Sequence, residues 1–259
     1  MTRYSKLILD LDGTLYRGPN PIPGAIEAVA RFRETCSILC LSNNGNQTSE
    51  RLVRRLRGMG FDVRDGELVC SLDLIVEAVN DLGSSLRILT ISSGDLDGAL
   101  EEAGHRVVTS GRADAVVAGV DASITYDKLA HALKALLAGA ALIGANADAT
   151  YPTHEGPRPA AGAFVGAIAA MGFAPNRMCG KPDPCAMRAA FERRGFEPGP
   201  DCLLIGDRVD ADVLGAQALG IDSALVLTGV SGREEIGTLA EPPTYVAESI
   251  DHVRRIVGF

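Results

Sequence analysis

Residues 6–15 read KLILDLDGTL, an aliphatic run that ends in two acidic side chains. Such a run indicates a buried strand that carries charge to its carboxyl end. In an extended chain, residues two apart project from the same face, so Asp10 and Asp12 can converge on one point. Gly13 permits a tight turn directly after them. Two carboxylates this close repel each other unless a cation lies between them, and a hard divalent cation takes oxygen ligands.

Two other interpretations of Asp10-Leu11-Asp12-Gly13 are a strand that ends in a solvated acidic turn and the opening of an EF-hand loop. The EF-hand is excluded because a strand, not a helix, precedes Asp10. In addition, residues 20–23 contain no Glu near the twelfth position of such a loop. The acidic turn stays open on this stretch alone, so the choice depends on the rest of the chain.

The composition is that of a soluble globular protein, with 46% hydrophobic and 22% charged residues among 259. This length suits one large domain or two. No apolar run is long enough for a membrane span, and Asp10 and Asp12 interrupt the N-terminal hydrophobic segment. We therefore expect a cytoplasmic protein with no membrane partner. The net charge of −8, without a basic block, argues against a nucleic-acid partner.

Strand and helix patterns alternate along the rest of the chain. After the first strand, the expected strands are 37–41, 86–91, 115–118, 141–145, 202–205 and 224–227. The expected helices are 25–33, about 48–57, 127–138, 163–171, one that ends at 194 and one that follows 212, and residues 146–162 are expected to form a long loop. This alternation predicts an α/β fold with a parallel sheet covered on both faces. Ligands bind such sheets at the carboxyl ends of the strands.

Three of the expected strands end in polar side chains, and a lysine stands in a turn rich in Gly and Pro. These residues are Asp10 with Asp12, Ser42 with Asn43, Asp207 with Asp212, and Lys181. Carboxylates, a hydroxyl, amides and a lysine at one sheet edge supply what phosphoryl transfer needs: a nucleophile, a cation site and fixed donors for phosphate oxygens. A carboxylate can be the nucleophile, forming an aspartyl-phosphate.

Four segments in this order resemble the four motifs of the haloacid-dehalogenase superfamily of phosphatases. They are DLDGT at 10–14, SNN at 42–44, GKP at 180–182 and GDRVDAD at 206–212. The long interval between Ser42 and Lys181 resembles the branch with a large inserted cap, the NagD-like or p-nitrophenyl-phosphatase-like family. The resemblance implies a Rossmann-like, doubly wound core of residues 1–70 and 179–259, with an α/β cap of the C2 type at 71–178. It also allows for a homodimer formed through the cap.

The same resemblance implies roles for individual residues. Asp10 would be the nucleophile, and Asp12 would protonate the leaving group and then activate water. Ser42, Asn43 and Lys181 would bind the phosphate. Mg²⁺ would be the cofactor, held by Asp10, the backbone carbonyl of Asp12, and Asp207, with Asp212 orienting a metal-bound water or Lys181.

Three further residues are candidates for substrate contacts, each with an ordinary alternative. Arg158 suits a second anionic group, because guanidinium matches carboxylate and phosphate bidentately. His154 lies in the same polar loop, where a histidine is more often only solvated. Arg208 beside Asp207 fits a structural ion pair as well as a ligand contact.

The predicted function is hydrolysis of a small phosphomonoester, such as glycerol phosphate, a sugar phosphate, phosphoglycolate or a nucleoside monophosphate. The low aromatic content, with five Tyr and no Trp, favours small polyol or sugar phosphates over substrates that stack. A phosphomutase would share all four motifs. A phospho-acceptor module that senses ligands is the alternative from another class, and Asp12 argues against it because a built-in base shortens the life of an acyl-phosphate.

Overall fold

In the computed structural model, which describes residues 3–153, 156–237 and 239–259, the chain divides into two compact units. The first unit comprises Met1–Ser42, Glu50–Val69 and Lys181–Phe259, and the second comprises Asn43–Ser49 and Cys70–Gly180. Residues 43–49, which we expected in the core, group with the second unit. Their polar groups bond there, as when the Asn46 amide donates to the Ser93 hydroxyl at 3.1 Å.

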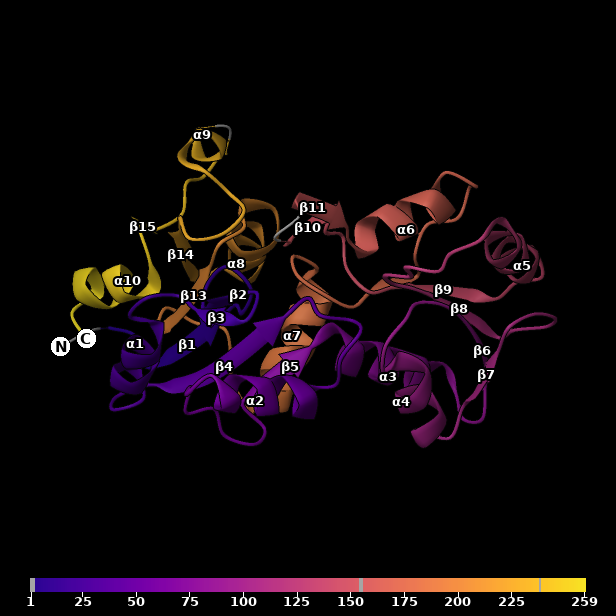
Figure 1. The fold of residues 1–259 in the computed structure, drawn as a ribbon, viewed down its shortest axis with the longest axis horizontal. Coiled ribbons are helices and arrows are strands. Elements are labelled where there is room, and N and C mark those ends of the chain that lie inside the picture. The colour runs from indigo at the N-terminus through magenta and orange to yellow at the C-terminus, as the bar shows by residue number, and fades with distance from the viewer. Residues whose placement is uncertain (1–2, 154–155, 238) are drawn as a thin grey trace. The chain divides into compact units, whose positions relative to one another are not determined.

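The first unit is built on a sheet whose order, within the described residues, is β15-β14-β13-β1-β4-β5 (Figure 1). The strands are β1 (Lys6–Leu9), β4 (Ser37–Ser42), β5 (Leu68–Cys70), β13 (Cys202–Gly206), β14 (Asp222–Val226) and β15 (Tyr245–Ala247). All pairs from β15 to β4 are parallel. The three central strands are aliphatic and almost wholly buried, as expected when helices cover both faces. The predicted α/β fold with a doubly wound parallel sheet is confirmed.

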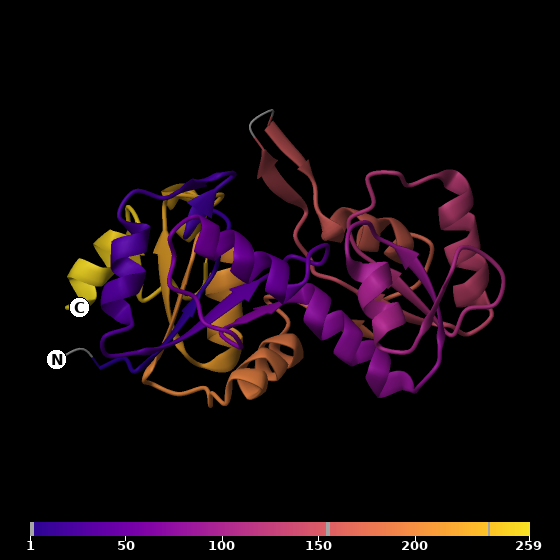
Figure 2. The same ribbon diagram turned by 60° about the horizontal axis from the view of Figure 1, so that its bottom comes forward.

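Helices cover this sheet on both sides (Figure 2). They are α1 (Ala25–Phe32), α2 (Ser49–Gly58), α7 (Pro184–Arg194), α8 (Leu214–Leu219) and α10 (Ile250–Val257), while the short α9 (Arg233–Ile236) lies in the connection from β14 to β15. α1 packs against α10 on one face, and α7 packs against α8 on the other. Phe32 of α1 and Phe191 of α7 are fully buried, so each face contributes an aromatic ring to the core.

The second unit has its own parallel sheet, in the order β12-β9-β8-β6-β7 within the described residues. Its strands are β6 (Arg87–Ile91), β7 (Arg106–Val108), β8 (Ala115–Ala118), β9 (Ala141–Gly144) and β12 (Arg177–Met178), and its helices are α3 (Ser71–Leu82), α4 (Leu96–Glu102), α5 (Tyr126–Leu137) and α6 (Ala161–Ala169). Aliphatic residues from these elements form a separate core. In the described ranges, no helix combines the length and apolarity that crossing a membrane requires.

Residues 146–162, which we expected to form a loop, contain a β-hairpin in the second unit. β10 (Thr150–Thr153) pairs with β11 (Gly156–Pro159) in antiparallel register. The loop was predicted because proline disfavours strands and because the segment lacks an alternation of apolar and polar residues. In the structure Pro152 lies opposite Pro157 in the two-stranded ribbon, which needs no such alternation. A shorter hairpin of β2 (Tyr16–Arg17) and β3 (Asn20–Pro21), also not predicted, follows the turn at Gly13.

A buried ion pair joins the end of α1 to the segment that leads into β5. The Glu67 side chain is 5% exposed and accepts hydrogen bonds from the Arg33 guanidinium at 2.9 and 2.7 Å. The backbone N–H of Arg64 adds a third bond at 2.9 Å. Burial by itself raises the pKa of Glu67, but the bonds and charge of Arg33 hold that pKa below its ordinary value.

We expect Glu67→Ala to lower the free energy of unfolding by about 3–5 kcal/mol at pH 7, because it removes the buried carboxylate partner of Arg33 and leaves only the exposed Asp62 to pair with that guanidinium. Since the folded-state pKa of Glu67 is lowered, its contribution is present above the unfolded pKa and is lost as the pH falls through the folded one. Urea unfolding at pH 7 and in acid measures both effects. The control is Glu34→Ala, whose pair with Arg31 is solvent-exposed and worth about 0–1 kcal/mol; equal losses in the two variants would contradict the assignment.

Candidate active site

Asp10 and Asp12 lie at the carboxyl end of β1, between β13 and β4. The backbone N–H of Asp10 donates to the carbonyl of Ile205 at 2.9 Å, which extends the parallel pairing with β13 beyond the end of β1. The Asp10 carboxyl is buried, whereas Asp12 keeps exposed surface. The carboxyl end of β1 therefore supplies one carboxyl that is shielded from water, Asp10, and one that water can reach, Asp12.

The ammonium group of Lys181 lies between two carboxylates. Its Nζ donates to Oδ1 of Asp10 at 2.6 Å and to Oδ1 of Asp212 at 2.7 Å, and the residue is 2% exposed. Burial lowers the pKa of Lys181, but the charges of Asp10 and Asp212 outweigh it and raise this pKa above its ordinary value. Burial also raises the pKa of Asp10 to about 7, against the opposing charge of Lys181. Lys181 therefore stays charged at the centre of the site.

Glycines allow the backbone to approach the two carboxylates that follow β13. A Cβ added to Gly229 would lie 1.7 Å from Oδ2 of Asp207, and one on Gly13 would lie 2.4 Å from the same atom. A Cβ on Gly206 would lie 2.1 Å from the carboxyl carbon of Asp212. Gly13 also has φ +87°, a conformation that other residues rarely adopt. These contacts explain why the first and fourth motifs need glycine beside their acids.

Asp207 presents an oxygen that the protein does not satisfy. Its Oδ2 accepts from the backbone N–H of Val230 at 2.7 Å, while its Oδ1 is buried without a hydrogen-bond partner among the described residues. One oxygen each from Asp10, Asp207 and Asp212 lie within 4.8 Å of one another, and in the part of the chain that the structure describes no other such group could hold a metal ion. Burial and the charges of the other two carboxylates raise the pKa of Asp207 well above its ordinary value. This donor set fits a hard cation.

Asp212 rather than the neighbouring Asp210 joins this cluster. A π-helical turn at Val209–Val213 turns the Asp212 carboxylate inward, where its Oδ2 accepts from the backbone N–H of Arg208 at 3.0 Å. Asp210 instead points outward and is held bidentately by the Arg208 guanidinium at 2.9 and 2.7 Å. The ordinary alternative for Arg208, an ion pair, is thus present, and its predicted substrate contact stays a prediction.

Ser42 is the last residue of β4, and Asn43 follows it. Ser42 is buried at the same edge of the sheet as Asp10, because β4 pairs with β1 in parallel. The Asn43 amide belongs to the second unit and donates to both carboxylate oxygens of Asp148 at 3.1 Å. The Asn146 amide in turn donates to the Asn43 carbonyl at 2.7 Å. The residue after Ser42 is therefore fixed by partners about 100 positions later.

Asp12 has two neighbours that the sequence analysis did not identify. The Tyr16 hydroxyl lies within hydrogen-bonding reach of the Asp12 carboxyl, and the Arg55 guanidinium is close enough to act on that carboxyl electrostatically. Desolvation raises the pKa of Asp12, and these two neighbours offset only part of that rise. A raised pKa increases the share of the Asp12 carboxyl that carries a proton for general acid catalysis.

The loop after β14 also contributes groups that the sequence analysis missed. The Thr228 hydroxyl donates to the carbonyl of Gly13 at 2.6 Å, and the Val230 N–H holds Asp207 as described above. The backbone N–H of Ser231 donates to the carbonyl of Asp207 at 3.1 Å. A cluster of small and polar residues at the carboxyl end of a parallel strand was the available signal.

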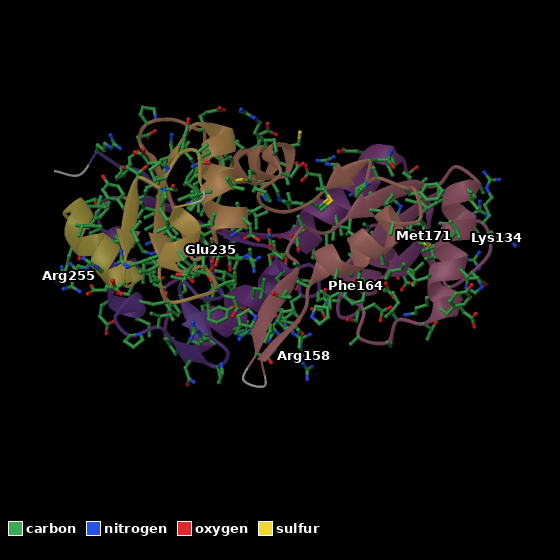
Figure 3. All side chains as sticks on the ribbon, turned by 90° about the horizontal axis from the view of Figure 1, so that it is seen from above. Lys134, Arg158, Phe164, Met171, Glu235 and Arg255 are labelled. Carbon is green, nitrogen blue, oxygen red and sulfur yellow. The ribbon has the colours of Figure 1, made fainter. Side chains whose placement is uncertain are left out.

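The candidate substrate contacts of the long loop have separate outcomes. Arg158 lies on β11 opposite Tyr151 of β10, so the two share one face of the hairpin, and Figure 3 labels Arg158 there. Its role in substrate binding stays a prediction. His154 lies outside the described residues.

Known proteins are similar to this chain along nearly its whole length. A family model described as haloacid dehalogenase-like hydrolase matches residues 7–106, and one described as HAD-hydrolase-like matches residues 178–253. An acid sugar phosphatase of Staphylococcus aureus is 30% identical over 246 residues, which is 95% of each chain. The structure of p-nitrophenyl phosphatase from Archaeoglobus fulgidus superposes with a TM-score of 0.89 at 29% identity, covering 98% of this chain and 99% of that one. The structure of glycerol phosphate phosphatase from Mycobacterium tuberculosis, in complex with magnesium, superposes with a TM-score of 0.85 at 32% identity. It covers 97% of this chain and 76% of that one.

We expect Mg²⁺ to raise the thermal unfolding midpoint more at pH 8 than at pH 5.5. Because burial raises the pKa of Asp10 to about 7 from an ordinary value near 3.8, the metal-free fold holds a proton that the unfolded chain has released. Its stability therefore falls as the pH rises through that window. A cation binds the deprotonated carboxylates, so binding strengthens with pH.

Differential scanning fluorimetry with Mg²⁺ or with EDTA at the two pH values measures this shift. Asp207→Asn should remove it, while Asp210→Asn, at an exposed acid of the same loop, should leave it unchanged. A shift that is independent of pH, or one that survives Asp207→Asn, would place the cation elsewhere.

Proposed function

The chain belongs to the haloacid dehalogenase-like hydrolases, in the branch of the p-nitrophenyl phosphatases, and we propose on this premise that it hydrolyses small phosphomonoesters by way of an aspartyl-phosphate. The observation that carries this proposal is the buried Lys181 between Asp10 and Asp212, at the end of strands β1 and β13. It leaves a nucleophilic carboxylate fixed beside a permanent positive charge, the arrangement that an incoming phosphate dianion needs.

In the first half-reaction, the Asp10 carboxylate attacks phosphorus and the bond between phosphorus and the ester oxygen breaks. Lys181 holds Asp10 at 2.6 Å and offsets the charge of the nucleophile and the phosphate. Asp12 gives its proton to the departing alkoxide, a role that its raised pKa and exposed surface support. The Ser42 hydroxyl and Asn43 would bind the phosphate oxygens.

In the second half-reaction, the now ionised Asp12 takes a proton from water while that water attacks phosphorus. The bond from phosphorus to Asp10 breaks, which releases inorganic phosphate and regenerates the carboxylate. Asp12 thus ends protonated, as it began, and one residue acts as acid and then as base.

We propose Mg²⁺ as the cation for the carboxylate cluster, held by Asp10, Asp207 and the backbone carbonyl of Asp12. The unsatisfied Oδ1 of Asp207 and the magnesium complex of the M. tuberculosis relative support this choice. When bound, the ion offsets phosphate charge and stabilises the charge that develops during transfer. Asp212, which already bonds Lys181, would orient that lysine or a metal-bound water.

The substrates are proposed to be small polyol or sugar phosphates. The names of two relatives, acid sugar phosphatase and glycerol phosphate phosphatase, support this class. We propose that the second unit acts as a cap and that Arg158 contacts a further polar or anionic group of the substrate.

We expect Asp10→Asn to abolish phosphate release from glycerol phosphate while the fold is kept, because the change is nearly isosteric but removes the nucleophile. Asp12→Asn should slow turnover by roughly 10²–10⁴, the usual value of general acid–base catalysis. The measurement is inorganic phosphate released with Mg²⁺ or EDTA, with Asp210→Asn as the control, since that exposed acid lies outside the carboxylate cluster.

Three outcomes would overturn parts of this assignment. Substantial activity in Asp10→Asn would mean a different nucleophile. Transfer of the phosphoryl group to a second hydroxyl of the sugar, without release, would indicate a mutase. A stable, acid-labile phosphoenzyme after acyl-phosphate treatment, with no turnover of any ester, would indicate a phospho-acceptor module.

We expect Arg158→Ala to raise KM for phosphoglycolate by about tenfold, because its carboxylate loses a guanidinium partner. KM for glycerol phosphate, which has no second anion, should change much less. Steady-state kinetics on both substrates tests this, with Arg106→Ala, at the exposed first position of β7, as the matched loss of a charge in the second unit. Equal changes for the two substrates would exclude Arg158 as the reader of a second anion.

A further inference from the structure

Tyr16 is built into the same turn as Asp12. Tyr16 is 1% exposed, and an isolated backbone bridge joins it to Asp12. The carbonyl of Tyr16 also accepts from the N–H of Gly13 at 2.8 Å, which closes the turn. The phenol hydroxyl of Tyr16 also lies within hydrogen-bonding reach of the Asp12 carboxyl. Tyr16 therefore holds Asp12 through both its backbone and its side chain.

Arg55 of α2 lies over the ring of Tyr16. Its guanidinium carbon lies 4.4 Å from the ring centroid, and its Nη2 donates to the carbonyl of Gly18 at 2.6 Å. The neighbouring Arg54 and Arg57 are exposed, whereas Arg55 is half-buried. A guanidinium over an aromatic face is a favourable contact, more so when it is partly desolvated. The direction of the Arg55 side chain thus follows from the ring that it covers.

The first unit contains a second trio of the same composition, which serves as an internal comparison. The hydroxyl of the buried Tyr4 donates to Asp222 at 2.6 Å, and the Arg3 guanidinium lies 4.9 Å from the Tyr4 ring. Tyr4 precedes β1 and Asp222 begins β14, so this trio lies at the amino ends of the strands. The Tyr16 trio lies at the carboxyl ends, where the candidate site is. If Tyr16 only stabilised the fold, removing its hydroxyl and removing the Tyr4 hydroxyl would have similar effects on activity.

We propose that Tyr16 and Arg55 are positioning residues, which hold the Asp12 carboxyl in the orientation that delivers its proton to the leaving group. This inference rests on the proposed function, in which Asp12 is the general acid. A hydrogen bond from the phenol to one carboxyl oxygen leaves the other oxygen for the substrate. Proton transfer requires heavy atoms within about 2.6–3.2 Å, so a carboxyl free to rotate would spend less time in reach. Arg55 keeps the phenol ring in place.

The test compares leaving groups in the wild type and in Tyr16→Phe. p-Nitrophenolate departs without a proton, whereas the alkoxide of glycerol phosphate requires one. Because kcat/KM reports the steps up to departure of the leaving group, we expect Tyr16→Phe to lower kcat/KM for glycerol phosphate by about tenfold. The value for p-nitrophenyl phosphate should change by less than about twofold. Tyr4→Phe, which removes a hydrogen bond of the same kind at the other end of the strands, should leave kcat/KM unchanged for both substrates.

Substitutions of Arg55 give a second test of the same inference, which does not depend on the folding of Tyr16→Phe. Arg55→Gln removes the cation from the ring and should reproduce the loss for glycerol phosphate, and Arg55→Lys should restore part of it. Asp12→Asn is the reference, because it should lose activity on glycerol phosphate far more than on p-nitrophenyl phosphate in kcat/KM.

The outcomes separate this inference from the proposed function. If Asp12→Asn shows no dependence on the leaving group, Asp12 is not the acid and the proposed function fails at that step. If Asp12→Asn shows the dependence but Tyr16→Phe or Arg55→Gln affects both substrates equally, the two residues only stabilise the fold. That second result would overturn the positioning role and leave the phosphatase mechanism intact.

Discussion

The buried ammonium of Lys181 is the interaction on which the site depends. It neutralises two carboxylates that come from positions 171 and 31 residues away along the chain. Without it, the three clustered acids would repel one another in a place where water cannot screen them. With it, Asp10 is held ready while the oxygen of Asp207 stays unsatisfied and open to a cation. The lysine therefore makes a strongly acidic cluster compatible with a folded protein.

The order of the strands explains why these groups meet. β1 lies in the middle of the sheet, with β13 on one side and β4 on the other, and all three run in parallel. Their carboxyl ends therefore open at one edge, where Ser42 ends β4 and where Asp10 and Asp207 directly follow β1 and β13. The loop after β14 completes this edge from the next strand, since Val230 bonds Asp207 and Thr228 bonds the turn after β1. The fold brings the groups together, and small residues such as Gly229 let them come close.

Local pattern was sufficient to predict the α/β fold and the residues that the structure brings together around Lys181. Aliphatic runs followed by acids identify parallel strands that deliver charge, whatever lies between them in the chain. The sequence analysis chose Asp212 over the neighbouring Asp210, and in the structure Asp212 bonds Lys181 from a π-helical turn that leaves Asp210 exposed. The same reasoning missed Tyr16, Arg55 and Asp148, since each matters through a long-range or side-chain contact that leaves no periodic trace. The hairpin at β10 and β11 was missed because its prolines resemble a loop.

The position of β1 has a consequence for the ribosome-bound chain. One neighbour of β1, β4, is made almost at once, but Leu9 pairs with Ile205, about 200 residues later. At 5–20 residues per second, β13 emerges roughly 10–40 s after β1. During that interval β1 has an open edge, and the second unit is synthesised and can fold first. The architecture therefore leaves that edge open to pairing with another chain for this period.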